Sequence, residues 1–410
     1  MSSSPAGTKP DFDSAGVAGG AETRRWRGQS WSWRRWRGPR RRTPEWITPG
    51  LITWTRWVAI IGWAMAFAGK CFLDGIPYFR SDLLMWMAIG LAAASIGKRA
   101  IWTVVLDFVP FALVLIAYDY LRGISDTLGM PTWWHPQNDV DKFLFGGTQP
   151  TVWLQEHGKY PAAQWWDVAG TLIYVSFFFL PYVTAAVLWL RSRAEFGQWA
   201  GRFVALSFLG FGLFALIPAA PPWAAARCSA AEVAKHPSNP VCMAFNPSWV
   251  RSGGMLGQVT HQRPGAHAYI ERLSGRGFSQ LHLKFAGAVI RTGQSGVDQV
   301  AAVPSLHAGG TMLFVVFFWR RSKVWVRAVL ASYAVLMGLA LAYQAEHYIS
   351  DVLAGWLCAF AVAAVFGYVE RPRRRARPVV TLDGPPHAPA PTASRMENPC
   401  PPIATTPSST

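Results

Sequence analysis

The sequence predicts an all-α fold, a polytopic integral membrane bundle of about eight transmembrane helices. Hydrophobic residues make up 51% of the 410 residues and charged residues only 15%, which leaves few charges for a water-facing surface. The apolar residues gather in runs of about 17 to 25, long enough for a helix to cross a bilayer. Basic residues gather in short blocks between these runs, a pattern typical of membrane proteins that follow the positive-inside rule.

Eight apolar runs are candidate spans, and their order defines the expected bundle. The second and the sixth are the shortest, so their ends are the hardest to place. We expect spans near residues 51–69, 82–97, 100–121, 166–190, 203–220, 305–319, 325–345 and 351–369.

The basic connectors predict the orientation of these spans. If the N-terminal arginine block lies in the cytoplasm, every short basic connector falls on that same side, and so does the C-terminus. The protein is then a multi-pass protein of the cell membrane with both termini cytoplasmic. Two polar segments, 122–165 and 221–304, face outward. The second of them carries Lys and Arg, but long loops cross a membrane regardless of their charge.

The two terminal segments are basic and differ in composition from the span region. We expect a disordered basic tail over residues 1–45, a membrane domain over 46–370, and a basic, Pro-rich tail over 371–410. The alternating Arg and Trp before residue 45 also suit a segment that lies on a membrane surface. The formal net charge of +17 indicates an anionic membrane surface as partner rather than nucleic acid, because the basic blocks flank apolar runs.

The five cysteines are too few for a disulfide framework. Cys228 and Cys242 share one outward segment and can pair if that segment faces an oxidising compartment.

The stretch "PSLHA", residues 304–308, opens the sixth span at its expected outer end. Pro304 is tolerated in a first helical turn, and Ser305 can cap the helix. The free N–H groups of that turn form a potential anion site beside His307. The plainer interpretation of His307 is a side chain at the membrane interface with one edge of its ring exposed to water.

The stretch "HYISD", residues 347–351, opens the last span at the same face. Because His347 and Asp351 are four residues apart, we expect them on one helical face. A carboxylate that accepts the Nδ1 hydrogen leaves Nε2 with its lone pair exposed, as a nucleophilic or basic histidine requires. The alternative is a buried, hydrogen-bonded pair with no chemical role.

Together these stretches resemble the type 2 phosphatidic acid phosphatase (PAP2) superfamily, in the branch that includes inositol phosphorylceramide synthase. "DKFLFGGTQPTVWLQ" (141–155) and "IPAAPPW" (217–223) also look like that branch, and the similarity runs in order over roughly residues 100–370. The resemblance implies a PAP2-like core in which His347 attacks phosphorus, Asp351 orients it, and His307 serves as acid and then base. It implies a lipid or polyprenyl phosphate substrate, an alcohol or water as acceptor, an outward-facing site, and no metal or cofactor.

The sequence departs from the superfamily pattern at the phosphate-binding positions. Ala340 and Leu341 stand where an expected Ser-Arg pair precedes the histidine. Lys284 and Arg291 have the spacing of the first signature, although Thr292 replaces its proline. We expect the phosphate contacts to come from Ser305, Arg291, Arg122 and Lys284, with Arg251 and Arg263 as further candidates; a simple ion pair of Arg122 with Asp119 is the plainer interpretation of Arg122.

Three functions remain open from the sequence. The leading hypothesis is a membrane phosphoesterase or phosphotransferase that works through a phosphohistidine, and a lipid or polyprenyl phosphate phosphatase without transfer activity would use the same residues. A transporter or channel would instead place Asp107 with the two histidines and Asp351 in an ion path, although no duplicated half indicates one. A third possibility is a scaffold without catalytic activity that binds partners through its tails. The presence of both histidines and Asp351 argues against it, because a scaffold would not need them. Asp107 can equally serve in packing between helices.

Overall fold

The computed structural model describes residues 48–73, 80–122, 130–237, 240–243, 253–258, 264–283, 286–287 and 300–375. Contacts divide the chain into Met1–Thr48 and Pro49–Thr410, and the description below concerns the second unit. Helices dominate it, and its described residues contain two isolated β-bridges but no strand. The all-α, polytopic membrane fold expected from the sequence is therefore confirmed.

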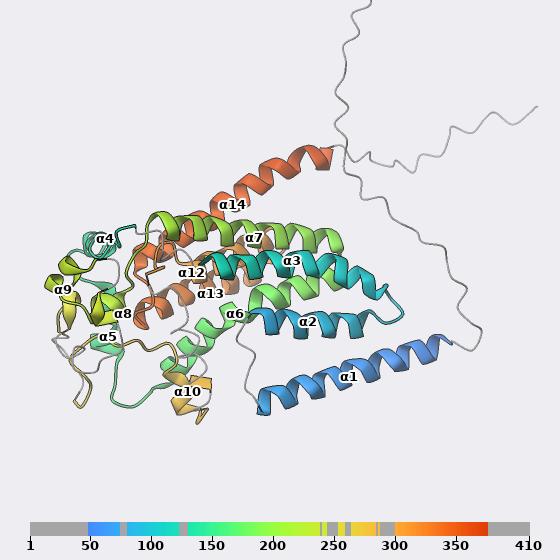
Figure 1. The fold of residues 1–410 in the computed structure, drawn as a ribbon, viewed down its shortest axis with the longest axis horizontal. Helices are drawn as coiled ribbons and strands as arrows, with labels where there is room; N and C mark the ends of the chain where they lie inside the picture. Colours follow the sequence, from blue (N-terminus) through green and yellow to red (C-terminus); the bar gives the residue numbers. More distant parts are fainter. Residues whose placement is uncertain are drawn as a thin grey trace, which may run out of the picture. The chain divides into compact units, whose positions relative to one another are not determined.

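The long helices form the membrane bundle, shown in Figure 1. Five of them are long and apolar enough to cross a membrane, and three are shorter apolar helices, so the count of eight spans stays a prediction. Their bounds are α1 Pro49–Leu73, α2 Arg80–Ser95, α3 Ile101–Arg122, α6 Trp165–Arg191, α7 Arg193–Leu216, α12 Leu306–Trp319, α13 Val324–Tyr343 and α14 Ile349–Arg375.

Two of these helices differ most from the expected ranges. Helix α7 begins at Arg193, ten residues before the expected start, because the Ser192 hydroxyl accepts a hydrogen bond from the Glu195 N–H and caps it. Its charged first turns are tolerated because Arg202 forms a two-pronged ion pair with Glu370 of α14. Helix α14 continues to Arg375, past the end of the span expected at residue 369.

The outward segments fold into short helices that we call the cap: the described residues between α3 and α6 and between α7 and α12. Its apolar core includes Trp134, Trp223 and Ile270. The cap elements are α4 Pro136–Leu144, α5 Pro150–Gly158, α8 Pro222–Ala225, α9 Ala230–Lys235, η2 Val241–Met243, η4 Gly254–Leu256 and α10 Gly277–Gln280.

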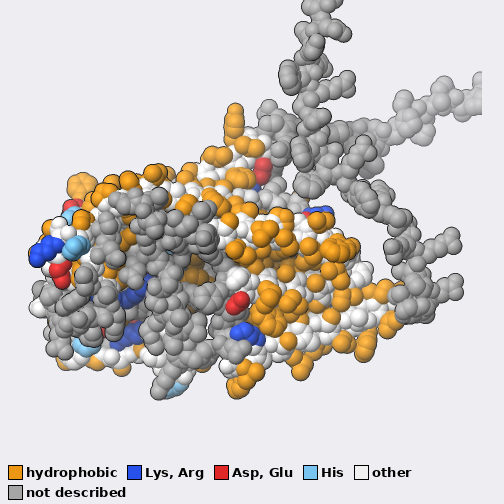
Figure 2. Space-filling model, in the orientation of Figure 1, with side chains coloured by type: hydrophobic (Ala, Val, Ile, Leu, Met, Phe, Trp, Pro, Cys, Tyr) orange, Lys and Arg blue, Asp and Glu red, His pale blue; other side chains and the backbone are white. Residues whose placement is uncertain are grey.

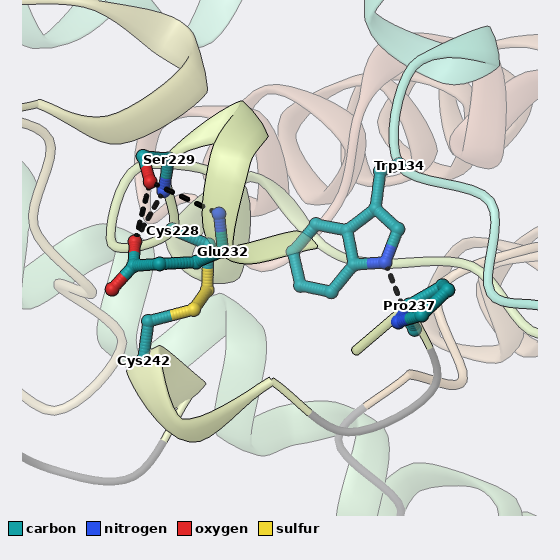
Figure 3. The surroundings of a disulfide bond; sticks show 6 residues. All are labelled: Trp134, Cys228, Ser229, Glu232, Pro237 and Cys242. Atoms are coloured by element: carbon teal, nitrogen blue, oxygen red, sulfur yellow. Dashed lines mark hydrogen bonds between the residues drawn. A yellow bond between two sulfur atoms is a disulfide. The ribbon is translucent and has the colours of Figure 1, made fainter. Parts of the chain in front are cut away.

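A disulfide between Cys228 and Cys242 closes part of the cap, as Figure 3 shows. Beside it, the Ser229 hydroxyl and the Glu232 carboxylate form a capping box that begins α9. The Trp134 indole donates to the Pro237 carbonyl at 2.7 Å and joins α9 to the first cap segment. The pairing that the sequence left open is thus made in the structure, and it suits an oxidising compartment.

The bundle has the surface expected of a membrane protein. Helix α1 contains no buried residue, and its Trp54, Trp57 and Met65 side chains are exposed. In Figure 2 hydrophobic side chains cover the long helices, whereas charged side chains gather at the cap end. The main apolar core lies among α2, α3, α6, α7, α12 and α14 and is rich in aromatic rings. Lipid therefore covers the outside of a bundle whose inside is close-packed.

Helices α12 and α14 approach each other closely at two glycines. A Cβ atom on Gly309 would lie 2.9 Å from the Gly355 carbonyl oxygen, and one on Gly355 would overlap the Ser305 carbonyl oxygen. These glycines therefore let the two backbones touch. Gly310 likewise leaves room for the Phe177 ring of α6. Gly309 and Gly310 therefore permit the close packing of α12 against α14 and α6.

Replacing Gly355 by alanine should lower the stability of the bundle. The added methyl group meets backbone rather than a movable side chain, so we expect a loss of about 2–3 kcal/mol despite the better helix propensity of alanine. The measurement is the melting temperature of the purified protein in detergent. Gly367→Ala in the same helix is the control, because nothing lies within 4 Å of its Cβ position. Equal melting temperatures for the two variants would contradict the contact.

Candidate active site

Ser305 begins α12 and links it to α14. Its hydroxyl accepts a hydrogen bond from the Ala308 N–H at 3.3 Å, which confirms the predicted cap. Its own N–H donates to the Asp351 carbonyl at 3.0 Å. The side chain is completely buried. One residue thus fixes both the start of α12 and its register against α14.

His307 lies in the first turn of α12 and is surrounded by aromatic rings of α6. Tyr174 stacks on the imidazole with ring centroids 5.0 Å apart, and the Phe177 and Phe178 rings lie at 4.4 and 5.6 Å. One stacked, one tilted and one edge-on contact together hold the imidazole plane in one orientation.

His347 precedes α14 rather than lying within it, so the expected shared helical face is not what holds it. Its Nδ1 lies 3.0 Å from the Ala302 carbonyl oxygen and 3.6 Å from Oδ2 of Asp351. A carbonyl oxygen can only accept, so this bond requires the hydrogen on Nδ1 and leaves the lone pair on Nε2. This is the expected tautomer, with the hydrogen on Nδ1. The acceptor nearest to Nδ1 is the Ala302 backbone carbonyl rather than the Asp351 carboxylate.

Asp351 nevertheless belongs to the same arrangement. Its side chain is fully buried, and Oδ2 accepts a hydrogen bond from the Tyr348 N–H at 2.9 Å. This bond fixes the carboxylate at the N-terminus of α14, where negative charge is stabilised. From there it faces the imidazole of His347 and can stabilise a positive charge on that ring.

The two imidazoles converge. The ring centroids of His307 and His347 are 5.6 Å apart, with an angle of 56° between the planes. Groups that react lie about 3–3.5 Å apart, so rings at this separation can contact the same small group. The structure thus brings together Ser305, His307, His347 and Asp351, four of the residues singled out in the sequence.

The turn that carries His347 is anchored by Asp141 of α4. This fully buried carboxylate accepts hydrogen bonds from the N–H groups of Ile349 at 2.9 Å and Ser350 at 2.8 Å. Burial raises the pKa of Asp141, and the two backbone bonds oppose that shift. Asp141 therefore caps α14 directly after His347. Asp141 is the first residue of the stretch 141–155 that resembles the family, but the resemblance implied no role for it.

A buried ion pair holds the residue directly before His347. Arg272 donates to both carboxylate oxygens of Glu346, at 2.8 and 2.7 Å. Burial alone would raise the pKa of Glu346, but the Arg272 guanidinium outweighs it and the pKa lies below its ordinary value. Such paired, buried charges fix geometry at a considerable desolvation cost.

A second guanidinium group, that of Arg227, lies near this pair. Arg272 and Arg227 lie over the indole ring of Trp223, 4.7 and 4.9 Å from its centroid. Burial lowers the pKa of Arg227, and the like charge of Arg272 lowers it further. Planar guanidinium groups are the side chains best suited to phosphate oxygens. Sequence reasoning missed both arginines, because only Trp223 stood in a recognisable stretch.

The remaining predicted phosphate ligands lie outside what the structure describes. Arg291, Lys284, Arg251 and Arg263 fall between described residues, and only the backbone of Arg122 is described, as the last residue of α3. Ala340 and Leu341 are buried in α13, in keeping with their place inside a span. Within the described ranges, no group of three or more His, Cys, Asp or Glu side chains is arranged to hold a metal ion.

The contacts of Asp107 are made with α6 and α7 rather than with the histidines. Its carboxylate accepts hydrogen bonds from the Trp189 indole at 2.7 Å and from the Arg193 guanidinium. These bonds tie α3 to the junction of α6 and α7. The packing role, one of the two interpretations open from the sequence, accounts for this residue.

Comparisons with known proteins agree with these features. A family model described as "PAP2 superfamily" matches residues 146–365, which contain both histidines and Asp351. The chain is 26% identical over 301 residues to phosphoinositol dihydroceramide synthase of Bacteroides thetaiotaomicron, covering 70% of this chain and 85% of that protein. No solved structure matches the chain.

Replacing Glu346 by glutamine should destabilise the protein at neutral pH. The depressed pKa means that the wild-type pair contributes stability above pH 4.5 and loses it as the pH falls through the lower, folded-state pKa. Removing one partner of a buried pair costs about 3 kcal/mol. Melting temperatures of wild type and variant should therefore stay apart from pH 7 down to pH 4.5. They should converge only as the pH falls further, because wild type then loses the contribution of the pair.

The matched control is Glu195→Gln, which removes the carboxylate of an exposed pair whose atoms are 4.0 Å apart. We expect it to change stability by less than about 0.5 kcal/mol. A Glu346→Gln profile parallel to the wild-type profile at every pH would contradict the assignment.

Proposed function

Because the chain belongs to the PAP2 superfamily, we propose that it transfers a phosphorylated headgroup between membrane lipids through a phosphohistidine intermediate. Membership places it among membrane phosphoesterases and phosphotransferases that act on lipid phosphates. The single observation that carries the finer proposal is the convergence of His307 and His347, with the hydrogen of His347 held on Nδ1.

In the proposed first step, Nε2 of His347 attacks the phosphorus of a lipid phosphodiester. A P–N bond forms, the P–O bond to the leaving alcohol breaks, and His307 donates the proton that the leaving oxygen needs. Positive charge appears on the His347 ring, where Asp351 stabilises it. A helix N-terminus favours negative charge, so the start of α12 beside His307 suits the charge that develops on the phosphoryl oxygens.

In the second step His307, now neutral, accepts the hydroxyl proton of the acceptor as the acceptor oxygen attacks phosphorus. The P–N bond breaks and His347 returns to its starting form. Protons balance over the two steps, since His307 first gives one and then takes one. The proposed mechanism therefore needs the two histidines in opposite protonation states at the start of each step, with His307 protonated and His347 neutral in the first.

An alcohol acceptor is favoured over water by the similarity to a synthase. The relative's name specifies a phosphoinositol dihydroceramide product, and its match covers most of both chains. We therefore propose a phospho-headgroup donor and a long-chain lipid alcohol as acceptor. The alternative, a phosphatase without transfer activity, requires only that water take the acceptor position.

The ion-path alternative is less well supported. It would need Asp107 near the histidines, but the carboxylate is engaged by Trp189 and Arg193 instead. A proton path in a transporter is also expected near a break in helices at mid-membrane. Here the histidines lie at helix ends beside the cap.

Alanine at His347 or His307 should abolish or nearly abolish turnover. Loss of the nucleophile removes the covalent route, and loss of an acid–base group costs about 10²–10⁴ in rate. The measurement incubates purified protein with labelled phospholipids, polyprenyl phosphates and alcohol acceptors and resolves the products by mass. His236→Ala, which changes an exposed histidine of the cap, is the control and should keep wild-type activity. Wild-type turnover in either active-site variant would refute the proposal.

We also propose that the cap and the histidines face outward and that both termini are cytoplasmic. The disulfide in the cap and the basic residues of the opposite connectors support this orientation.

A cysteine at Ala162, an exposed cap position, should then react with an impermeant thiol reagent added to intact cells. The background carries alanine at Cys71, Cys358 and Cys400. The matched control is Ser322→Cys, in the connector between α12 and α13, which should react only after the membrane is opened. The reverse labelling pattern would overturn the orientation.

A further inference from the structure

A cavity of about 220 Å³ lies at the end of the bundle away from the histidines. It is formed by α1, the turn between α2 and α3, and the last residues of α6. Leu190 in its wall is sixteen residues along α6 from Tyr174, which stacks on His307, a distance of about 24 Å at 1.5 Å per residue. The cavity is therefore separate from the candidate active site.

Three cationic side chains line the cavity, and no carboxylate does. They are Arg56 of α1 and Lys98 and Arg99 of the turn that follows α2. In the described part of the chain, none of the three forms an ion pair with Asp or Glu. Three positive charges without a counter-charge favour an anionic ligand.

Backbone carbonyls hold the two arginines in place. Arg56 Nε donates to the Ile96 carbonyl at 2.7 Å, and Arg99 donates to the Trp189 carbonyl at 2.6 Å while its guanidinium lies 4.6 Å from the Trp189 ring centroid. Basic side chains at the ends of α2 and α6 also stabilise the helix termini. Binding to these carbonyls engages the Nε of Arg56 and part of the Arg99 guanidinium. It does not explain Lys98, whose side chain is exposed.

The other walls of the cavity are apolar. Trp57 and Ile60 of α1 and Leu190 of α6 contribute to them. The outer face of α1 continues this surface with exposed Trp54, Trp57 and Ile61 side chains. A ligand that fits here carries a negative head beside a hydrocarbon part, and tryptophan is typical of the depth at which lipid headgroups lie.

We propose that this cavity binds the phosphate group of an anionic phospholipid, with Arg56, Lys98 and Arg99 as its ligands and the acyl chains along α1. The site is independent of the proposed reaction, because it lies on different helix ends from the histidines. In the proposed orientation its lipid comes from the cytoplasmic leaflet, whose anionic lipids attract basic residues.

The test titrates the purified full-length protein with phosphatidylglycerol, or with phosphatidylcholine of the same acyl chains, and measures binding by native mass spectrometry. Wild type should bind phosphatidylglycerol more tightly. Lys98→Ala should weaken that binding about fivefold, and the double variant Arg56→Gln, Lys98→Ala should weaken it further. Because the Lys98 side chain is exposed, the single variant should fold normally and is decisive by itself.

The matched control is Lys323→Ala, in the exposed connector that begins α13, which should bind like wild type. Three results would overturn the proposal: equal binding of the two lipids, unchanged binding by Lys98→Ala, or an equal loss in Lys323→Ala. Displacement of phosphatidylglycerol by inorganic phosphate at comparable concentration would also overturn it, because the site would then recognise phosphate alone. Enzyme activity does not enter these measurements, so a failure here is distinct from a failure of the proposed function.

Discussion

The backbone contact between α12 and α14 is the constraint on which the candidate site depends. The two helices begin next to each other because Gly309 and Gly355 carry no side chain and because the Ser305 N–H donates to the Asp351 carbonyl. His307 lies two residues after Ser305 and His347 four residues before Asp351. The register of this one contact therefore sets the distance between the imidazoles. A shift of one helical turn, about 5.4 Å, would roughly equal their whole separation.

Buried charge is the second feature that organises the site. The segment from 346 to 351 holds two fully or nearly buried carboxylates, and a third, Asp141, reaches it from α4. Each has partners that offset its desolvation: Arg272 for Glu346, the N–H groups at the start of α14 for Asp141, and the Tyr348 N–H for Asp351. Such a network fixes the backbone around His347 on both sides. The imidazole is thereby oriented before any substrate arrives, as preorganised catalysis requires.

Much of the fold and part of the site could be predicted from the sequence. Apolar runs locate helices because the bilayer imposes both their length and their composition, and Ser305 acts as the cap that its position predicts. The start of α7 was missed because charged residues count against a span, and only the structure shows Arg202 paired with Glu370. Asp351 was predicted as a partner of His347, but the Ala302 carbonyl beside His347 and the Asp141 carboxylate that caps α14 were missed. The Ala302 carbonyl is 45 residues away and Asp141 caps Ile349 across 208 residues, and no local pattern encodes such contacts.

The most direct measurement of the central claim is the chemical identity of the covalent intermediate. Purified protein is mixed with a radiolabelled phospholipid donor, quenched in base within one turnover, digested and mapped by mass. The account predicts an acid-labile, base-stable phosphoramidate on the peptide that contains His347. A modified His307, or steady product formation with no labelled peptide at any time, would contradict it.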